Sequence, residues 1–114
     1  MTKADVTAAE ELLAAQLADL IRFRDVVEAQ RAVLRTSDSD LLVRFSREAE
    51  ELAATVAGRE VRLLALRRSI QVADGGREPP SVRSLAAQVD RARSIATTDA
   101  NDLAREMEGQ AREL

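Results

Sequence analysis

The fold of this chain is decided by the stretch Leu42–Ile70, which reads LVRFSREAEELAATVAGREVRLLALRRSI. Its apolar residues recur at alternating intervals of three and four for four heptads, with Arg59 as the one polar exception. This spacing places the side chains on one stripe of an α-helix and is typical of a helix that packs along another helix. The stretch therefore predicts a long helix with a seam formed by Leu42, Phe45, Ala49, Leu52, Val56, Arg59, Leu63, Leu66 and Ile70.

A similar seam precedes this stretch. Thr7 followed three residues later by Glu10 has the spacing of a capping box, which predicts that a helix starts there. Arg24 and Arg31 lie close to the seam, and a guanidinium that faces a partner helix must reach solvent or find a carboxylate. Apolar residues recur there at intervals of seven, and two further apolar residues lie between them at helical spacing. The seam consists of Leu13, Leu17, Leu20, Phe23, Val27 and Leu34.

Two short segments connect the helices. Arg35–Asp40 is rich in turn-forming residues, and Ser37 with Asp40 repeats the capping-box spacing, so the two long helices are predicted to fold back antiparallel. Asp74–Pro80 contains paired glycines and paired prolines, which predict the end of the second helix and a linker. Gly58, inside the second helix, marks either a close approach of another element or a soft point.

A third helix is predicted to start with Ser81 as its cap. Its apolar stripe is thinner, and the poor helix formers of Thr97–Asp102 predict a bend, a break or a partner-dependent segment. We therefore expect an all-α protein. Residues 1–73 form a long antiparallel helical hairpin of the coiled-coil kind, residues 74–80 a linker and residues 81–114 a third helix that completes a three-helix bundle.

The composition argues against several classes of function. The chain has no His, Cys or Tyr, so we expect neither an enzyme nor a bound metal or cofactor. The 17 basic and 20 acidic residues are interspersed, which disfavours nucleic acid as a partner. No apolar run is long enough to insert into a membrane, and Met1–Asp5 lacks the apolar stretch of a signal peptide. We expect a cytoplasmic protein.

The order of these features resembles the FlgN-type flagellar export chaperones, a family of helical cytoplasmic proteins. In that family a Glu-rich helix is followed by a short polar turn that ends in Asp, and then by a second helix with basic–acidic pairs in a heptad pattern. An Asn before a Leu is often found in the last long helix, as Asn101 and Leu103 are here. The earlier residues that carry the resemblance are Glu28, Leu34, Ser37, Asp38, Leu41, Leu42, Glu48, Glu51, Leu52, Arg59, Glu60, Leu63 and Leu64.

The resemblance implies a protein that binds the amphipathic C-terminal helix of a flagellar hook-associated export substrate and keeps it unassembled before type III export. The third helix is then the expected binding element. An alternative hypothesis is a structural coiled-coil scaffold or assembly subunit whose seams pair with a second copy, so a homodimer is possible under either view. The expected partner-binding residues are Leu85, Val89, Ile95, Asn101, Leu103 and Met107.

Overall fold

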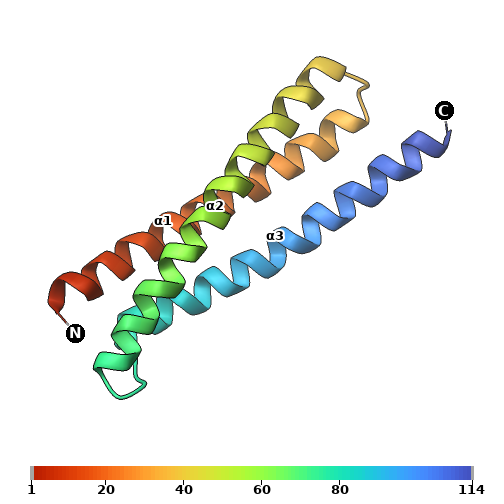
Figure 1. Cartoon of the computed structure of the whole chain (residues 1–114). Helices are drawn as coiled ribbons and strands as arrows, with labels where there is room; N and C mark the ends of the chain where they lie inside the picture. Colours follow the sequence, from red (N-terminus) through yellow and green to blue (C-terminus); the bar gives the residue numbers. More distant parts are fainter. Residues whose placement is uncertain (1, 114) are drawn as a thin grey trace.

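The computed structural model describes residues 2–113 as three long helices (Figure 1). The helices are α1 (Lys3–Leu34), α2 (Ser39–Ala73) and α3 (Pro80–Glu113). They form an elongated bundle with principal extents of 58 × 19 × 17 Å, in which α2 runs antiparallel to α1 and α3 runs parallel to it. The predicted all-α class is confirmed. Met1, where the predicted hairpin starts, and Leu114, where the predicted third helix ends, lie outside the described residues.

The helix boundaries correct two of the predicted caps. Thr2, and not Thr7, caps α1: its hydroxyl accepts from the Asp5 amide, and the Asp5 carboxylate accepts from the Thr2 amide. The shorter Asp side chain completes this box as Glu would, so the helix starts one turn earlier than expected. At α2 the cap is Asp38, which accepts from the Leu41 amide, while Ser37 takes a φ of 61° in the turn.

The linker before α3 reverses the chain through two left-handed glycines. Gly75 and Gly76 have φ values of 63° and 89°, and the Gly76 amide donates to the Gln71 carbonyl at 2.7 Å. The third helix begins at Pro80 rather than after Ser81, because proline suits a first helical turn, where its missing N–H is not needed. Gly58 faces open space, so no close approach explains it.

The central element of the bundle is α1. Both α2 and α3 pack along it, but over the described length of both helices the Cα atoms of α2 and α3 do not come within 8 Å of each other. The buried core is concentrated toward the linker end, where all three helices contribute. It consists of Ala9, Leu13, Leu20, Leu63, Ile70, Val82, Ala86, Val89, Ala92 and Ala96.

A polar layer interrupts the α1–α2 seam at Arg59, the exception in the predicted pattern. Gln16 is fully buried; its Nε2 donates to the Val56 carbonyl at 2.9 Å, and its Oε1 accepts from Arg59 at 2.9 Å. The same Arg59 nitrogen also donates to Asp19 at 2.7 Å. A half-buried guanidinium with two acceptors is well satisfied, and a shifted register would leave these groups unpaired, so the layer favours one pairing of the two helices.

Ion pairs join α1 to α3 in the half nearer the turn. Arg24 pairs with Asp99 at 3.2 Å, and Arg31 pairs with Glu106 at 2.6 Å. The two arginines near the predicted seam thus find carboxylates on the third helix. The helix runs unbroken through Thr97–Asp102, so the predicted break is wrong: tertiary pairing of Asp99 outweighs the weak helix propensity of these residues.

We expect Leu13→Ala to lower the free energy of unfolding by about 2–4 kcal/mol, because Leu13 is 2% exposed and its truncation leaves a cavity in the core. Leu64→Ala, at a position 55% exposed, serves as the matched control and should cost less than about 1 kcal/mol. Urea unfolding, monitored by circular dichroism, measures the free energy of unfolding of both variants. Equal losses in the two variants would contradict the position of the core.

Candidate functional site

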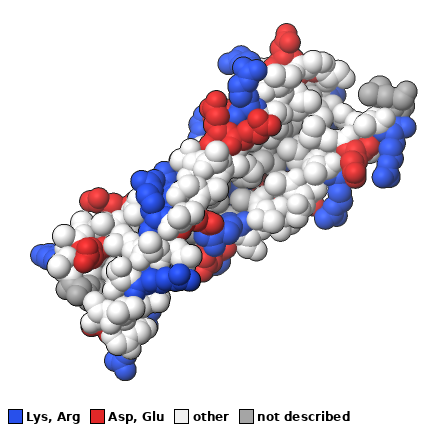
Figure 2. Space-filling view, in the orientation of Figure 1, with Lys and Arg blue, Asp and Glu red and all other residues white. Residues whose placement is uncertain are grey.

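The candidate site is a groove that follows the boundary between α2 and α3, with α1 as its floor. It arises because both helices pack closely on α1, while the Cα atoms of α2 and α3 stay more than 8 Å apart over their described length. Figure 2 shows this face of the molecule, with uncharged side chains in the hollow and charged side chains both at its edges and across its middle. The groove has two compartments, named here after the nearer chain connection.

The linker-side compartment has a volume of about 490 Å³. Its floor includes Leu13 of α1 and Leu63 of α2, both buried, and its outer wall includes the exposed Val61 and Leu64. Val61 is 71% exposed. The compartment is lined by Leu13, Ala57, Glu60, Val61, Leu63, Leu64, Arg67, Ala86, Val89, Asp90 and Arg93.

The turn-side compartment has a volume of about 290 Å³. Leu20 and Phe23 of α1 lie on its floor, and small residues of α2 and α3 form its walls. Because these wall residues are small, they leave room in the compartment for side chains of another molecule. The compartment is lined by Leu20, Phe23, Ala53, Val56, Ala57, Glu60, Arg93, Ala96, Thr97, Ala100 and Asn101.

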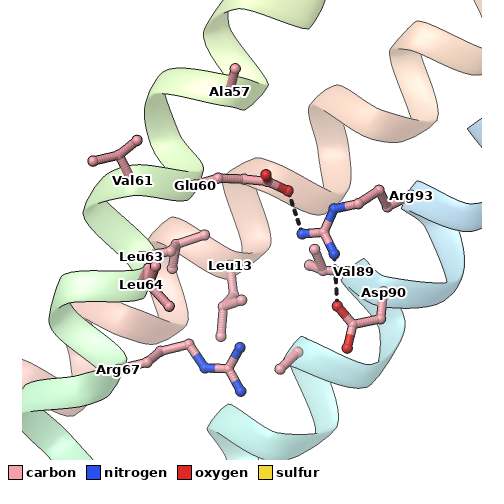
Figure 3. A pocket seen from close by; sticks show the side chains of 11 residues that line it. Leu13, Ala57, Glu60, Val61, Leu63, Leu64, Arg67, Val89, Asp90 and Arg93 are labelled. Atoms are coloured by element: carbon pink, nitrogen blue, oxygen red, sulfur yellow. Dashed lines mark hydrogen bonds and ion pairs between the residues drawn. The ribbon is translucent and has the colours of Figure 1, made fainter. Parts of the chain in front are cut away.

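A salt bridge crosses the groove where the two compartments meet. Glu60 of α2 and Arg93 of α3 pair at 2.5 Å, and Arg93 also pairs with Asp90 at 2.9 Å (Figure 3). Glu60 and Arg93 line both compartments, and we call their pair the crossbar. Their side chains are 40% and 42% exposed, so the crossbar lies at the surface of the groove and contributes little to stability.

A second ion pair fixes the linker at one end of the groove. Arg67 donates two hydrogen bonds to the Glu78 carboxylate, at 2.6 and 2.7 Å, and the Glu78 side chain is only 7% exposed. These hydrogen bonds and the nearby positive charge lower the pKa of Glu78 below its ordinary value of 4.5, although burial opposes them. The same pairing raises the pKa of Arg67. Arg67 is thereby held at the groove by a carboxylate of the linker.

The six residues expected to bind a partner fall into three environments. Val89 and Leu103 are buried, and Leu85 is half-buried and packed against the core. Asn101 is exposed and lines the turn-side compartment. Ile95 and Met107 are exposed outside both compartments.

The wall that α2 contributes was not predicted from the sequence. Ala57, Val61 and Leu64 lie beside the predicted seam of α2 rather than on it, and all three are exposed. Val61 and Leu64 were visible in the sequence as apolar residues outside the heptad pattern. That excess of apolar surface on one flank of the helix was the available signal.

Two further searches concern metals and membranes. Among residues 2–113, no group of three or more acidic side chains is placed to hold a metal ion. Within the same range, none of the three helices combines the length and the apolar character needed to cross a bilayer. Comparison of the chain with models of protein families, with curated proteins and with solved structures finds no match.

Because its pKa is lowered in the folded state, Glu78 stabilises the fold above pH 4.5, and this contribution is lost as the pH falls through the folded-state pKa. We therefore expect the free energy of unfolding to fall in acid, and to fall less steeply in Glu78→Gln. At neutral pH the variant should lose about 1 kcal/mol. Urea titrations from pH 7 to pH 3 measure both effects, with Glu11→Gln, at an exposed position of α1, as the control. An unchanged acid slope in Glu78→Gln would contradict this role.

Proposed function

We propose that this protein binds an amphipathic helix of a partner protein in the groove between α2 and α3. The observation that carries the proposal is the apolar groove itself, which is open to solvent because the backbones of α2 and α3 both lie close to α1 but not to each other. A helix that lays its apolar face into such a groove is a recurring mode of recognition.

The dimensions of the groove suit a helix of about four turns. Its wall on α2 extends from Ala53 to Arg67 and its wall on α3 from Ala86 to Asn101. At 1.5 Å per residue each wall is roughly 20 Å long. A bound helix would rest on Leu13, Leu20 and other floor residues and would cover the exposed Val61 and Leu64, which supports the groove as a binding surface.

The resemblance to FlgN-type chaperones suggests which partner this is. We propose that the bound helix is the amphipathic C-terminal segment of a flagellar hook-associated export substrate, held unassembled in the cytoplasm before type III export. The site proposed here differs from the one expected from the sequence, because α2 supplies one wall and α3 only the other. Val89 and Asn101 remain in the proposed site, because they line the linker-side and turn-side compartments; Leu85 and Leu103 act on it through the packing of α3 on α1.

A second candidate is a scaffold subunit that pairs with another copy of itself. The observation that favours it is the exposed apolar surface on α2, where Val43, Val61, Leu64 and Val72 are all more than half exposed. Pairing of two α2 helices would cover these residues without any other protein. The two candidates differ in whether the purified chain is a monomer.

Ala57 provides the test, because it lines both compartments and its side chain is exposed. Ala57→Trp should fill the groove without disturbing the core and weaken binding of a hook-associated C-terminal peptide at least about tenfold. Ala65→Trp places the same side chain at an exposed position of the same helix outside the groove, and should bind as the parent protein does. Isothermal titration calorimetry measures the affinities.

The oligomeric state distinguishes the alternatives in the same experiment. A monomer that binds the peptide, with binding lost only in Ala57→Trp, supports the chaperone. No binding of any hook-associated peptide, together with a concentration-dependent dimer in analytical ultracentrifugation, contradicts the proposed function and supports the scaffold.

A further inference from the structure

The two compartments lie on either side of the crossbar, and residues chosen from each are separated by the same number of positions on α2 as on α3. On α2, Leu64 of the linker-side compartment and Val56 of the turn-side compartment are eight residues apart, as are Val89 and Thr97 on α3. Eight residues of helix correspond to about 12 Å. A partner helix returns to nearly the same face after seven residues, a rise of about 10 Å, so side chains one heptad apart would reach both compartments.

The charges that line the groove are already paired with each other. Glu60 pairs with Arg93, Arg93 with Asp90, and Arg67 with Glu78. Of these residues, Glu60, Arg67, Asp90 and Arg93 line the two compartments, and no other charged side chain of the described residues does. A charge on the buried face of a partner helix would be removed from water without an available counter-charge, which is costly. The groove therefore selects an uncharged face.

The crossbar also limits how deeply a side chain of a partner helix can enter the middle of the groove. The Glu60 carboxylate and the Arg93 guanidinium span the space between α2 and α3, above the floor that Leu13 and Leu20 provide on either side. A large side chain that faced the crossbar would have to break the pair and bury its charges beside an apolar group. A small residue at that position lets the helix rest on the crossbar.

A second copy of this chain does not fit this pattern. In the described part of the chain, no two exposed large apolar residues on one helix are seven residues apart. Leu64 and Val72 come closest at eight, and the position between them is Arg68, which would meet the crossbar as a charge. The occupant is therefore a helix of a different protein.

Building on the function proposed above, we propose that the crossbar sets the specificity of the groove. The partner helix carries two large apolar side chains one heptad apart, an uncharged face between them, and a small residue such as Ala, Ser or Gly opposite Glu60 and Arg93. The two large side chains enter the two compartments, and the small residue passes over the ion pair.

The test uses capped synthetic helices of roughly 18 residues, long enough to form in water. The reference peptide has two Leu one heptad apart with Ala between them on the same face. One variant replaces the central Ala by Leu, a second replaces it by Glu, and a third moves the two Leu to one turn apart. We expect the reference peptide to bind the intact protein at least about tenfold more tightly than each variant. Fluorescence anisotropy of labelled peptides measures the affinities.

A protein variant tests the crossbar itself. Glu60→Ala with Arg93→Ala removes both side chains from a half-exposed pair, and circular dichroism checks that the helices remain. The peptide with a central Leu should then bind at least about tenfold more tightly than it binds the intact protein.

Equal binding of the peptides with central Ala and central Leu to the intact protein would overturn this inference and leave the proposed function standing. Failure of every peptide in the series would also overturn it, while the titration with hook-associated peptides decides the proposed function separately. A dimer that Ala57→Trp dissociates would assign the groove to a second copy and overturn both.

Discussion

The ion pairs of Arg24 with Asp99 and of Arg31 with Glu106 align the third helix with the first at the turn end of this protein. In both pairs the two residues are 75 positions apart in the sequence. The seven-residue step from Arg24 to Arg31 on α1 is therefore matched by the step from Asp99 to Glu106 on α3, so the two helices run parallel in a constant register. Each guanidinium stands close to an apolar seam and needs a carboxylate, and α3 supplies one at the matching spacing. With α3 held along α1, its Cα atoms stay more than 8 Å from those of α2 over the described length, and the groove lies between the two helices.

The two ends of the bundle are stabilised by different means. Near the linker, apolar residues such as Leu13, Ile70 and Val82 form a core to which all three helices contribute. Near the turn, polar contacts between α1 and α3 accompany the buried Leu103: Arg31 pairs with Glu106, and Gln110 donates to the Leu34 carbonyl. Ion pairs at partly exposed positions contribute less than buried apolar area and weaken with salt. The turn end is therefore the end at which α3 separates from α1 most readily.

Much of this fold could be predicted from the sequence, because heptad spacing and clusters of turn-forming residues are local signals. The seam of Leu42–Ile70 predicted α2, and the short turn predicted the antiparallel hairpin. The placement of α3 could not be predicted, since an Ala-rich seam fits several registers and the carboxylate partners of Arg24 and Arg31 are distant in sequence. The site depended on that placement. A stripe such as Val89 and Leu103 identifies an apolar face but not the helix that covers it, so part of the face expected to bind a partner packs on α1 instead.

The groove offers a partner little binding energy beyond apolar contact, since its charged side chains already form ion pairs within the protein, although Glu60 Oε1 and Arg93 Nε lack hydrogen-bond partners. Burial of a four-turn helix on Val61, Leu64 and the floor residues must offset the entropy lost when that helix becomes ordered. Affinity limited in this way suits a protein that holds a segment and later releases it. Selectivity then has to come from what the groove excludes, and the Glu60–Arg93 pair excludes charge and bulk at its centre at little cost to the fold. A polar pair that contributes little to stability can in this way decide which helices bind.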